Sequence, residues 1–174
     1  IEVFTTRPDT IFGVSFIVLA PEHELVQKIT TKNQEKEIKN YQNTSRLKTE
    51  RERISNVKTT TGAFTGAYAI HPFTNKKIPI WIGDYVLANY GTGAVMSVPC
   101  GDQRDWEFAK HFSLEIPNVF KDKDLSKGAF TEKDAVITNS DFLDGLTVEK
   151  ATKLAIFHIE QKGYGKGKTQ YKIR

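Results

Sequence analysis

The sequence predicts a mixed α+β fold, in which a curved or barrel-like β-sheet core is flanked by helices. Three observations support this fold class. The chain has 174 residues, which fits a single domain over residues 1–174. Its strand-like segments outnumber its helical segments, and several neighbouring strand-like segments are joined by short connections.

The first third of the chain is expected to run strand, loop, strand and helix. Residues 1–6 alternate β-branched residues with others, as a strand does. Residues 7–10 (Arg-Pro-Asp-Thr) interrupt this pattern, because proline disfavours helix in the residue before it. The apolar run 12–20 is long enough for a buried strand. A short helix should begin at Pro21, and the polar run 32–58 should form surface helices.

The middle of the chain predicts several short strands. Residues 59–65 are rich in Thr and Gly and indicate a turn. Residues 66–70 and 77–82 are typical of two strands joined by a hairpin-type connection. Residues 84–89 suit another strand, and the apolar run 94–98 suits a buried one.

The last third predicts two helices, a short strand and a strand-like C-terminal segment. Asp102 is a good N-cap for a helix that reaches Phe112. Residues 116–120 suit a short strand, and residues 148–162 show the spacing of an amphipathic helix. Residues 163–174 begin with glycine, a common helix stop, and end in a strand-like segment with four basic residues and no acid.

The stretch 90–109 contains the polar loop best placed for chemistry. The predicted strand 94–98 leads into a tight loop, which puts Asp102, Arg104 and Asp105 on the first turn of a helix. Acids at this position also interact favourably with the helix macrodipole. A purely structural role for Asp102 as a helix cap is therefore the alternative interpretation.

Composition narrows the class of protein. The chain is 39% hydrophobic and 26% charged, with a net charge of +4 that permits a nucleic-acid partner. No apolar run approaches the ~20 residues of a membrane helix, and no signal peptide is visible. A single cysteine excludes an internal disulfide and fits a reducing compartment.

Several common sites are also excluded. The four histidines are scattered without metal-ligand spacing, so no metal site is expected. Cys100 has no histidine partner near it in sequence, and we expect it to be inert. The Gly-Thr-Gly at 91–93 lacks the remaining residues of a phosphate-binding or dinucleotide-binding loop, and no Ser-His-Asp arrangement is recognisable.

Two polar loops that follow strand-like segments remain, residues 5–10 (TTRPDT) and 102–105 (DQRD). Together with GTGAVM at 91–96, they resemble the editing domain of bacterial-type leucyl-tRNA synthetases, the insertion called connective peptide 1. The resemblance covers most of the chain, through the ordered motifs TTRPDTIFG, LAPEHELV, IPIWIGDYVL, GTGAVM and VPCGDQRDWEFAKHF. TTRPDT combined with DQRD-aromatic-EFA points to the leucyl branch rather than the isoleucyl or valyl branch. The resemblance implies the editing-domain fold of class I aminoacyl-tRNA synthetases.

The resemblance implies post-transfer editing, in which water hydrolyses the ester of tRNA(Leu) mischarged with norvaline, isoleucine or a similar amino acid. Leu-tRNA(Leu) is spared. The residues implied in catalysis are Thr5, Thr6, Arg7, Asp102 and Asp105. The residues implied in substrate binding are Thr10, Tyr90, Met96, Val98, Arg104 and Asp105.

The resemblance assigns specific roles to some of these residues. It implies that Asp105 anchors the α-ammonium group of the substrate and that Thr10 crowds the leucine side chain. Thr5, Thr6 and Arg7 would line the ester and the attacking water. The Arg7 guanidinium could also reach Asp102, Asp105 or a substrate phosphate. Tyr90, Met96 and Val98 would flank the adenosine or the amino acid.

The resemblance also implies partners and location. The expected partners are the 3′-terminal adenosine of tRNA(Leu) carrying a wrong amino acid and the rest of the synthetase, with no membrane and a monomeric state. Editing needs no cofactor and no metal, since ATP and Mg²⁺ serve only the synthetic site of the full-length enzyme. The chain begins at Ile1 without an initiator methionine, and we expect a domain excised from a longer synthetase. The expected location is the cytoplasm, with an organelle as the alternative.

One position departs from the family pattern. The family usually has Gly-His-Asp or Ala-His-Asp where this chain has Cys100-Gly101-Asp102, so a histidine is missing at the edge of the pocket. Two other functions therefore stay open. The domain could be a catalytically weak or inactive module that only holds the tRNA 3′ end or supports the synthetase body. An unrelated small-molecule hydrolase would require the polar loops to match by coincidence.

Overall fold

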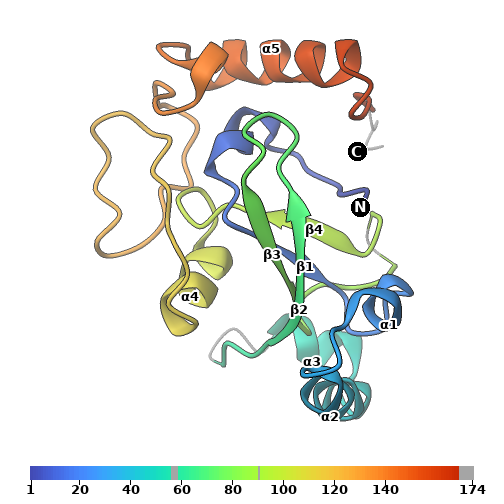
Figure 1. Cartoon of the computed structure of the whole chain (residues 1–174). Helices are drawn as coiled ribbons and strands as arrows, with labels where there is room; N and C mark the ends of the chain where they lie inside the picture. Colours follow the sequence, from blue (N-terminus) through green and yellow to red (C-terminus); the bar gives the residue numbers. More distant parts are fainter. Residues whose placement is uncertain (56–58, 90, 169–174) are drawn as a thin grey trace, which may run out of the picture.

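The structure is a computed structural model that describes residues 1–55, 59–89 and 91–168. Its centre is a four-stranded sheet in the order β2-β3-β1-β4 (Figure 1). The strands are β1 (Phe16–Leu19), β2 (Ala63–Ile70), β3 (Lys77–Ile82) and β4 (Ala94–Ser97). Helices flank the sheet, so the predicted mixed α+β class is confirmed. Within the described residues the sheet is open, with β2 and β4 at its edges, and does not close into a barrel.

Strand β1 pairs with a neighbour on each side and is buried along its whole length. Ile17 lies opposite Ile80 of β3 in a parallel pair and opposite Met96 of β4 in an antiparallel pair. The same register sets Ser97, at the end of β4, opposite Phe16, at the start of β1. The loop before β1 and the loop after β4 therefore emerge at the same end of the sheet.

Helical segments lie at both ends of the sheet and along one side of it (Figure 1). They are η1 (Pro8–Gly13), α1 (Leu25–Ile29), α2 (Glu35–Arg46), α3 (Glu50–Ser55), α4 (Gln103–His111), η2 (Asp141–Leu143) and α5 (Val148–Gln161). Figure 1 shows α5 across one end, where it packs on η1, and α1, α2 and α3 together at the opposite end. Across the described residues, no helix combines the length and apolar character needed to cross a lipid bilayer.

Two predicted strands are wrong. Residues 1–6 run irregularly along the sheet, although Phe4 N–H donates a hydrogen bond to the Ala94 carbonyl oxygen at 3.3 Å. Residues 84–89 form turns. Side chains of the helices bond to the backbone there, because Asp84 N–H donates to the Tyr41 hydroxyl and Arg53 donates to two carbonyl oxygens. These bonds replace the strand ladder that the apolar residues of this segment suggested.

Other predicted strands are shorter than expected. The apolar run 12–20 splits, because Pro8 begins the 3₁₀ helix η1 and the chain becomes a strand only at Phe16. The predicted strand 116–120 is reduced to an isolated bridge between Phe120 and Ile137. Residues 163–168 form turns and irregular chain, and the rest of the predicted C-terminal strand lies outside the described residues.

Candidate functional site

A pocket of about 450 Å³ lies at the end of the sheet where the loop before β1 and the loop after β4 emerge. Its wall contains every predicted site residue that the structure describes, namely Thr5, Thr6, Arg7, Thr10, Met96, Val98, Asp102, Arg104 and Asp105. Tyr90, the remaining predicted site residue, lies outside the described residues. Two loops that are more than 90 residues apart in sequence therefore contribute to one pocket.

The N-terminal loop folds around Arg7. The Arg7 guanidinium binds the carboxylate of Asp9 through Nε (3.0 and 3.2 Å) and Nη2 (2.8 Å), and Asp9 is fully buried. Arg7 N–H donates to the hydroxyl oxygen of Thr5 at 3.0 Å. The guanidinium also lies 5.8 Å from the ring centre of Phe120. Arg7 thus pairs with Asp9, a partner that sequence reasoning did not name, in place of the expected Asp102 or Asp105.

The hydroxyl and methyl groups of Thr10 have different neighbours. Its hydroxyl donates to the Arg7 carbonyl oxygen at 2.8 Å, so the polar group serves the loop. Its methyl carbon Cγ2 lies 3.8 Å from the position that a Cβ atom would take at Gly101, in the pocket wall. The methyl group of Thr10 therefore lies next to Gly101, although Thr10 as a whole is only 1% exposed.

Helix α4 places its first turn against the pocket. Asp102 is the N-cap of α4, and its Oδ1 accepts hydrogen bonds from the backbone N–H groups of Arg104 (2.9 Å) and Asp105 (3.1 Å). This is the structural role that we considered for Asp102 from sequence, and it fixes the start of the helix. Met96 on strand β4 lies in the same wall, as does Val98, the first residue after β4.

Asp105 is the most perturbed acid of the site. The residue is 7% exposed, its Oδ2 accepts a hydrogen bond from Val98 N–H at 2.8 Å, and its Oδ1 accepts one from the Tyr85 hydroxyl at 3.3 Å. Burial, followed by the negative charge of Asp102, raises the pKa of Asp105 to about 7. A cation entering the pocket would stabilise the ionised carboxylate, so the site is suited to bind a positively charged group.

The pocket also contains residues that sequence reasoning did not assign to it. Tyr85, Val86 and Leu87 come from the turn after β3, and the others are Phe4 and Val95. Gly101, which stands where the family has histidine, lines the pocket as expected. The motif IPIWIGDYVL contained the turn residues, but their assignment to a strand hid their role. At Gly101 the backbone is not left-handed, and an added Cβ would meet its nearest neighbour, the Phe120 ring, at an ordinary 3.5 Å. A side chain at position 101 would therefore start without a clash.

Cys100 and His71, two other side chains that could take part in catalysis, have structural roles. Cys100 is fully buried, and burial raises the pKa of its thiol to about 11, so the sulfur stays protonated. His71 donates from Nε2 to the Ile11 carbonyl oxygen at 2.9 Å and accepts the N–H groups of Phe73 and Thr74 at Nδ1. Among the residues described, no group of three or more His, Cys, Asp and Glu side chains could hold a metal ion.

Comparisons with known proteins point to one family. The family model described as "Leucyl-tRNA synthetase, editing domain" matches residues 1–160. The chain is 61% identical over 175 residues to a leucine–tRNA ligase of Christiangramia forsetii and 57% identical over 180 residues to one of Flavobacterium johnsoniae. These matches cover 100% of this chain but 18% and 19% of those relatives, so the chain spans about a fifth of their length.

A solved structure agrees with this assignment. The crystal structure of the ternary complex of Agrobacterium radiobacter K84 agnB2 LeuRS, tRNA and LeuAMS matches with a TM-score of 0.75 and 30% sequence identity. The match covers 98% of this chain and 18% of that chain. The motifs, the fold and the family model therefore agree, and the chain belongs to the leucyl-tRNA synthetase editing-domain family.

Proposed function

We propose that this domain hydrolyses the ester bond of tRNA(Leu) that carries a wrong amino acid, such as norvaline or isoleucine, and spares Leu-tRNA(Leu). A synthetic site cannot strongly reject a similar aliphatic side chain, since one methylene contributes only ~1–3 kcal/mol of discrimination. A second, hydrolytic site that excludes the correct product solves this problem. Family membership and the pocket at the end of the sheet support this function.

The observation that carries the proposal is that the buried Asp105 and Thr10 line the same pocket. We assign Asp105 to the α-ammonium group of the substrate, because an aminoacyl ester presents a cation next to the scissile bond. The Thr10 methyl group would then meet the amino-acid side chain and block the branched γ-carbon of leucine. The two groups together give a physical basis for accepting an amino acid and rejecting leucine.

The remaining pocket residues complete the proposed mechanism. The hydroxyl groups of Thr5 and Thr6 would orient the attacking water, assisted by a terminal ribose hydroxyl of the tRNA. The Arg7–Asp9 pair would hold this loop in place, with Arg7 in the pocket wall. Met96 and Val98 would flank the adenosine or the amino acid. No metal or cofactor enters this scheme.

We also propose the context of the domain. The relatives that it matches are about five times as long, so we assign the chain to an editing domain within a longer leucyl-tRNA synthetase. We also propose the cytoplasm as the location of that synthetase. Its partners would be the 3′-terminal adenosine of tRNA(Leu) and the synthetase body.

Deacylation of Ile-tRNA(Leu) by the full-length synthetase tests the proposal, with Asp105→Ala as the variant. The parent enzyme should release isoleucine, and Asp105→Ala should lose at least tenfold in rate, because the ammonium group loses its counter-charge. Asp134→Ala, which removes an exposed carboxylate, should retain the parent rate. An inactive parent enzyme, or an unchanged rate in a folded Asp105→Ala enzyme, would favour a module that only holds the tRNA 3′ end.

A further inference from the structure

The turn after β3 brings Tyr85 against helix α4. The Tyr85 hydroxyl lies 3.3 Å from Oδ1 of Asp105, and its ring packs edge-on against Phe108 with centres 6.0 Å apart. Asp105 and Phe108 are three residues apart and share one face of α4. Tyr85 therefore contacts this face at two points, through its hydroxyl and through its ring.

The carboxylate of Asp105 has a donor on each oxygen. Val98 N–H holds Oδ2 at 2.8 Å, and the Tyr85 hydroxyl holds Oδ1 at 3.3 Å. One donor is a backbone group and cannot be varied, whereas the other belongs to a side chain. Burial and the neighbouring Asp105 carboxylate raise the pKa of Tyr85 well above its usual value, so the hydroxyl keeps the proton that it donates.

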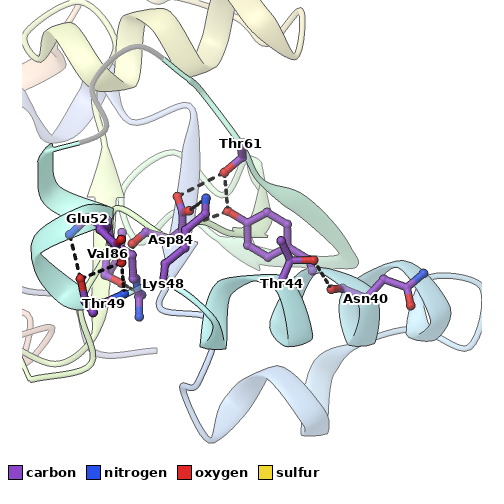
Figure 2. Close-up of polar contacts among 10 residues, drawn as sticks. Asn40, Thr44, Lys48, Thr49, Glu52, Thr61, Asp84 and Val86 are labelled. Atoms are coloured by element: carbon purple, nitrogen blue, oxygen red, sulfur yellow. Dashed lines mark hydrogen bonds and ion pairs between the residues drawn. The ribbon is translucent and has the colours of Figure 1, made fainter.

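The backbone on both sides of Tyr85 is fixed by helix α3. Arg53 is 8% exposed and donates from Nε to the Asp84 carbonyl oxygen at 2.6 Å and from Nη2 to the Val86 carbonyl oxygen at 2.8 Å. The carboxylate of Asp84 forms an ion pair with Lys48 Nζ at 2.7 Å. Figure 2 shows Lys48, Asp84 and Val86 within this polar network.

Helix α2 and the segment before β2 also hold Asp84, the residue before Tyr85, in place. The Tyr41 hydroxyl accepts Asp84 N–H at 2.9 Å and lies 2.9 Å from the Thr61 hydroxyl, which in turn donates to Asp84 Oδ1 at 3.2 Å. Close to Tyr85, a Cβ atom at Gly83 would lie 2.9 Å from the Tyr85 ring, so the ring position requires glycine there. The position of Tyr85 is thus set by groups outside the pocket.

We infer that Tyr85 is a positioning residue, whose hydroxyl holds the Asp105 carboxylate in the orientation that receives the α-ammonium group of the substrate. This inference rests on the proposed function. Tyr85 does not contact the scissile ester in this scheme and acts through Asp105. Loss of the hydroxyl should therefore weaken the reaction of substrates that carry an ammonium group and leave others unaffected.

The test compares Tyr85→Phe with the parent in the full-length synthetase, using two substrates. One is Ile-tRNA(Leu), and the other is the same tRNA acylated with the α-hydroxy analogue of isoleucine, which lacks the ammonium group. The Tyr85→Phe substitution keeps the ring that packs on Phe108. We expect kcat/KM to fall about 3–10-fold for Ile-tRNA(Leu) and to stay at the parent value for the α-hydroxy ester.

The pH profile gives a second readout. The charged groups of the pocket wall are Asp102, Arg104 and Asp105 on α4 or its N-cap and Arg7 in the N-terminal loop. With these groups unchanged, loss of one donor to the Asp105 carboxylate should make that carboxylate harder to ionise. As the pH is lowered, kcat/KM for Ile-tRNA(Leu) should then fall to half of its plateau value at a pH about 0.5–1 unit higher than in the parent. Tyr68→Phe, which removes an exposed hydroxyl on β2, serves as the matched control and should keep the parent profile.

Each outcome has a distinct meaning. A Tyr85→Phe enzyme with the parent kcat/KM and pH profile overturns the inference, as does an equal loss on both substrates, which indicates a general structural role. A selective loss on Ile-tRNA(Leu) with a shifted profile supports it. If the parent enzyme itself does not hydrolyse Ile-tRNA(Leu), the proposed function fails.

Discussion

At the residue scale, Asp105 combines its proposed role in binding the substrate ammonium group with a cost in stability. Its carboxylate is buried and has a raised pKa, whereas in the unfolded chain it ionises at its ordinary value. Sequence reasoning found Asp105 because it stands on the first turn of a helix after a strand. Its second donor could not be found in this way, since Tyr85 meets Asp105 only through a turn that the sequence pattern predicts as a strand.

The raised pKa predicts how stability depends on pH. Between the unfolded value of 3.8 and the folded value of about 7, the unfolded chain ionises Asp105 while the folded chain keeps the proton. The folded state then binds more protons, so the free energy of unfolding falls as pH rises through this window. Asp105→Asn should therefore be more stable than the parent at pH 8, by on the order of 1–3 kcal/mol, with a much smaller difference at pH 4.5.

Urea unfolding of the two proteins at both pH values checks this prediction, with Asp134→Asn as an exposed control. A stability gain of the same size at pH 4.5 and pH 8 would contradict the pKa assignment.

At the element scale, the turn after β3 depends on helix α3. Sequence reasoning predicted surface helices in residues 32–58, and the structure has α2 and α3 there. The mixed charges of residues 32–58 predicted a solvent-exposed surface. Arg53, however, is buried and donates hydrogen bonds to two carbonyl oxygens of the turn. A contact between residues about 30 positions apart leaves no periodic signal in the sequence, which is why both the turn and the role of Arg53 were missed.

This anchor leads to a prediction for Arg53→Met. The substitution leaves two carbonyl oxygens without their donor and Glu22 without its partner, so the free energy of unfolding should fall by about 2–4 kcal/mol. Arg51→Met removes an exposed arginine from the same helix and should change stability by less than about 0.5 kcal/mol. Urea unfolding measures both, and equal losses in the two variants would refute the anchoring role.

At the scale of the whole molecule, the pocket follows from the order and direction of the strands. The antiparallel register of β1 and β4 brings the loop before β1 and the loop after β4 to one end of the sheet. The polar loops themselves could be predicted from residue types, and the α+β class from the number and spacing of strands. Strand order and closure could not, because they depend on contacts between distant segments. Where we expected a curved or barrel-like sheet, the described residues form an open one.

The most direct test of the account is the discrimination between two charged tRNAs by the parent enzyme and by Thr10→Ala. Thr10 lines the pocket, its methyl carbon lies 3.8 Å from the position that a Cβ atom would take at Gly101, and its hydroxyl donates to the Arg7 carbonyl oxygen. If this methyl group excludes leucine, its removal should admit the correct product. Deacylation of Leu-tRNA(Leu) and Ile-tRNA(Leu) is measured side by side in the full-length synthetase.

We predict that the parent hydrolyses Ile-tRNA(Leu) and spares Leu-tRNA(Leu). Thr10→Ala should hydrolyse Leu-tRNA(Leu) at least tenfold faster than the parent and retain activity on Ile-tRNA(Leu). Thr10→Ser, which keeps the hydroxyl bond and removes the methyl group, should behave in the same way. Leu-tRNA(Leu) that survives equally long with all three enzymes, or a parallel loss of activity on both tRNAs, would contradict the proposed exclusion of leucine by Thr10.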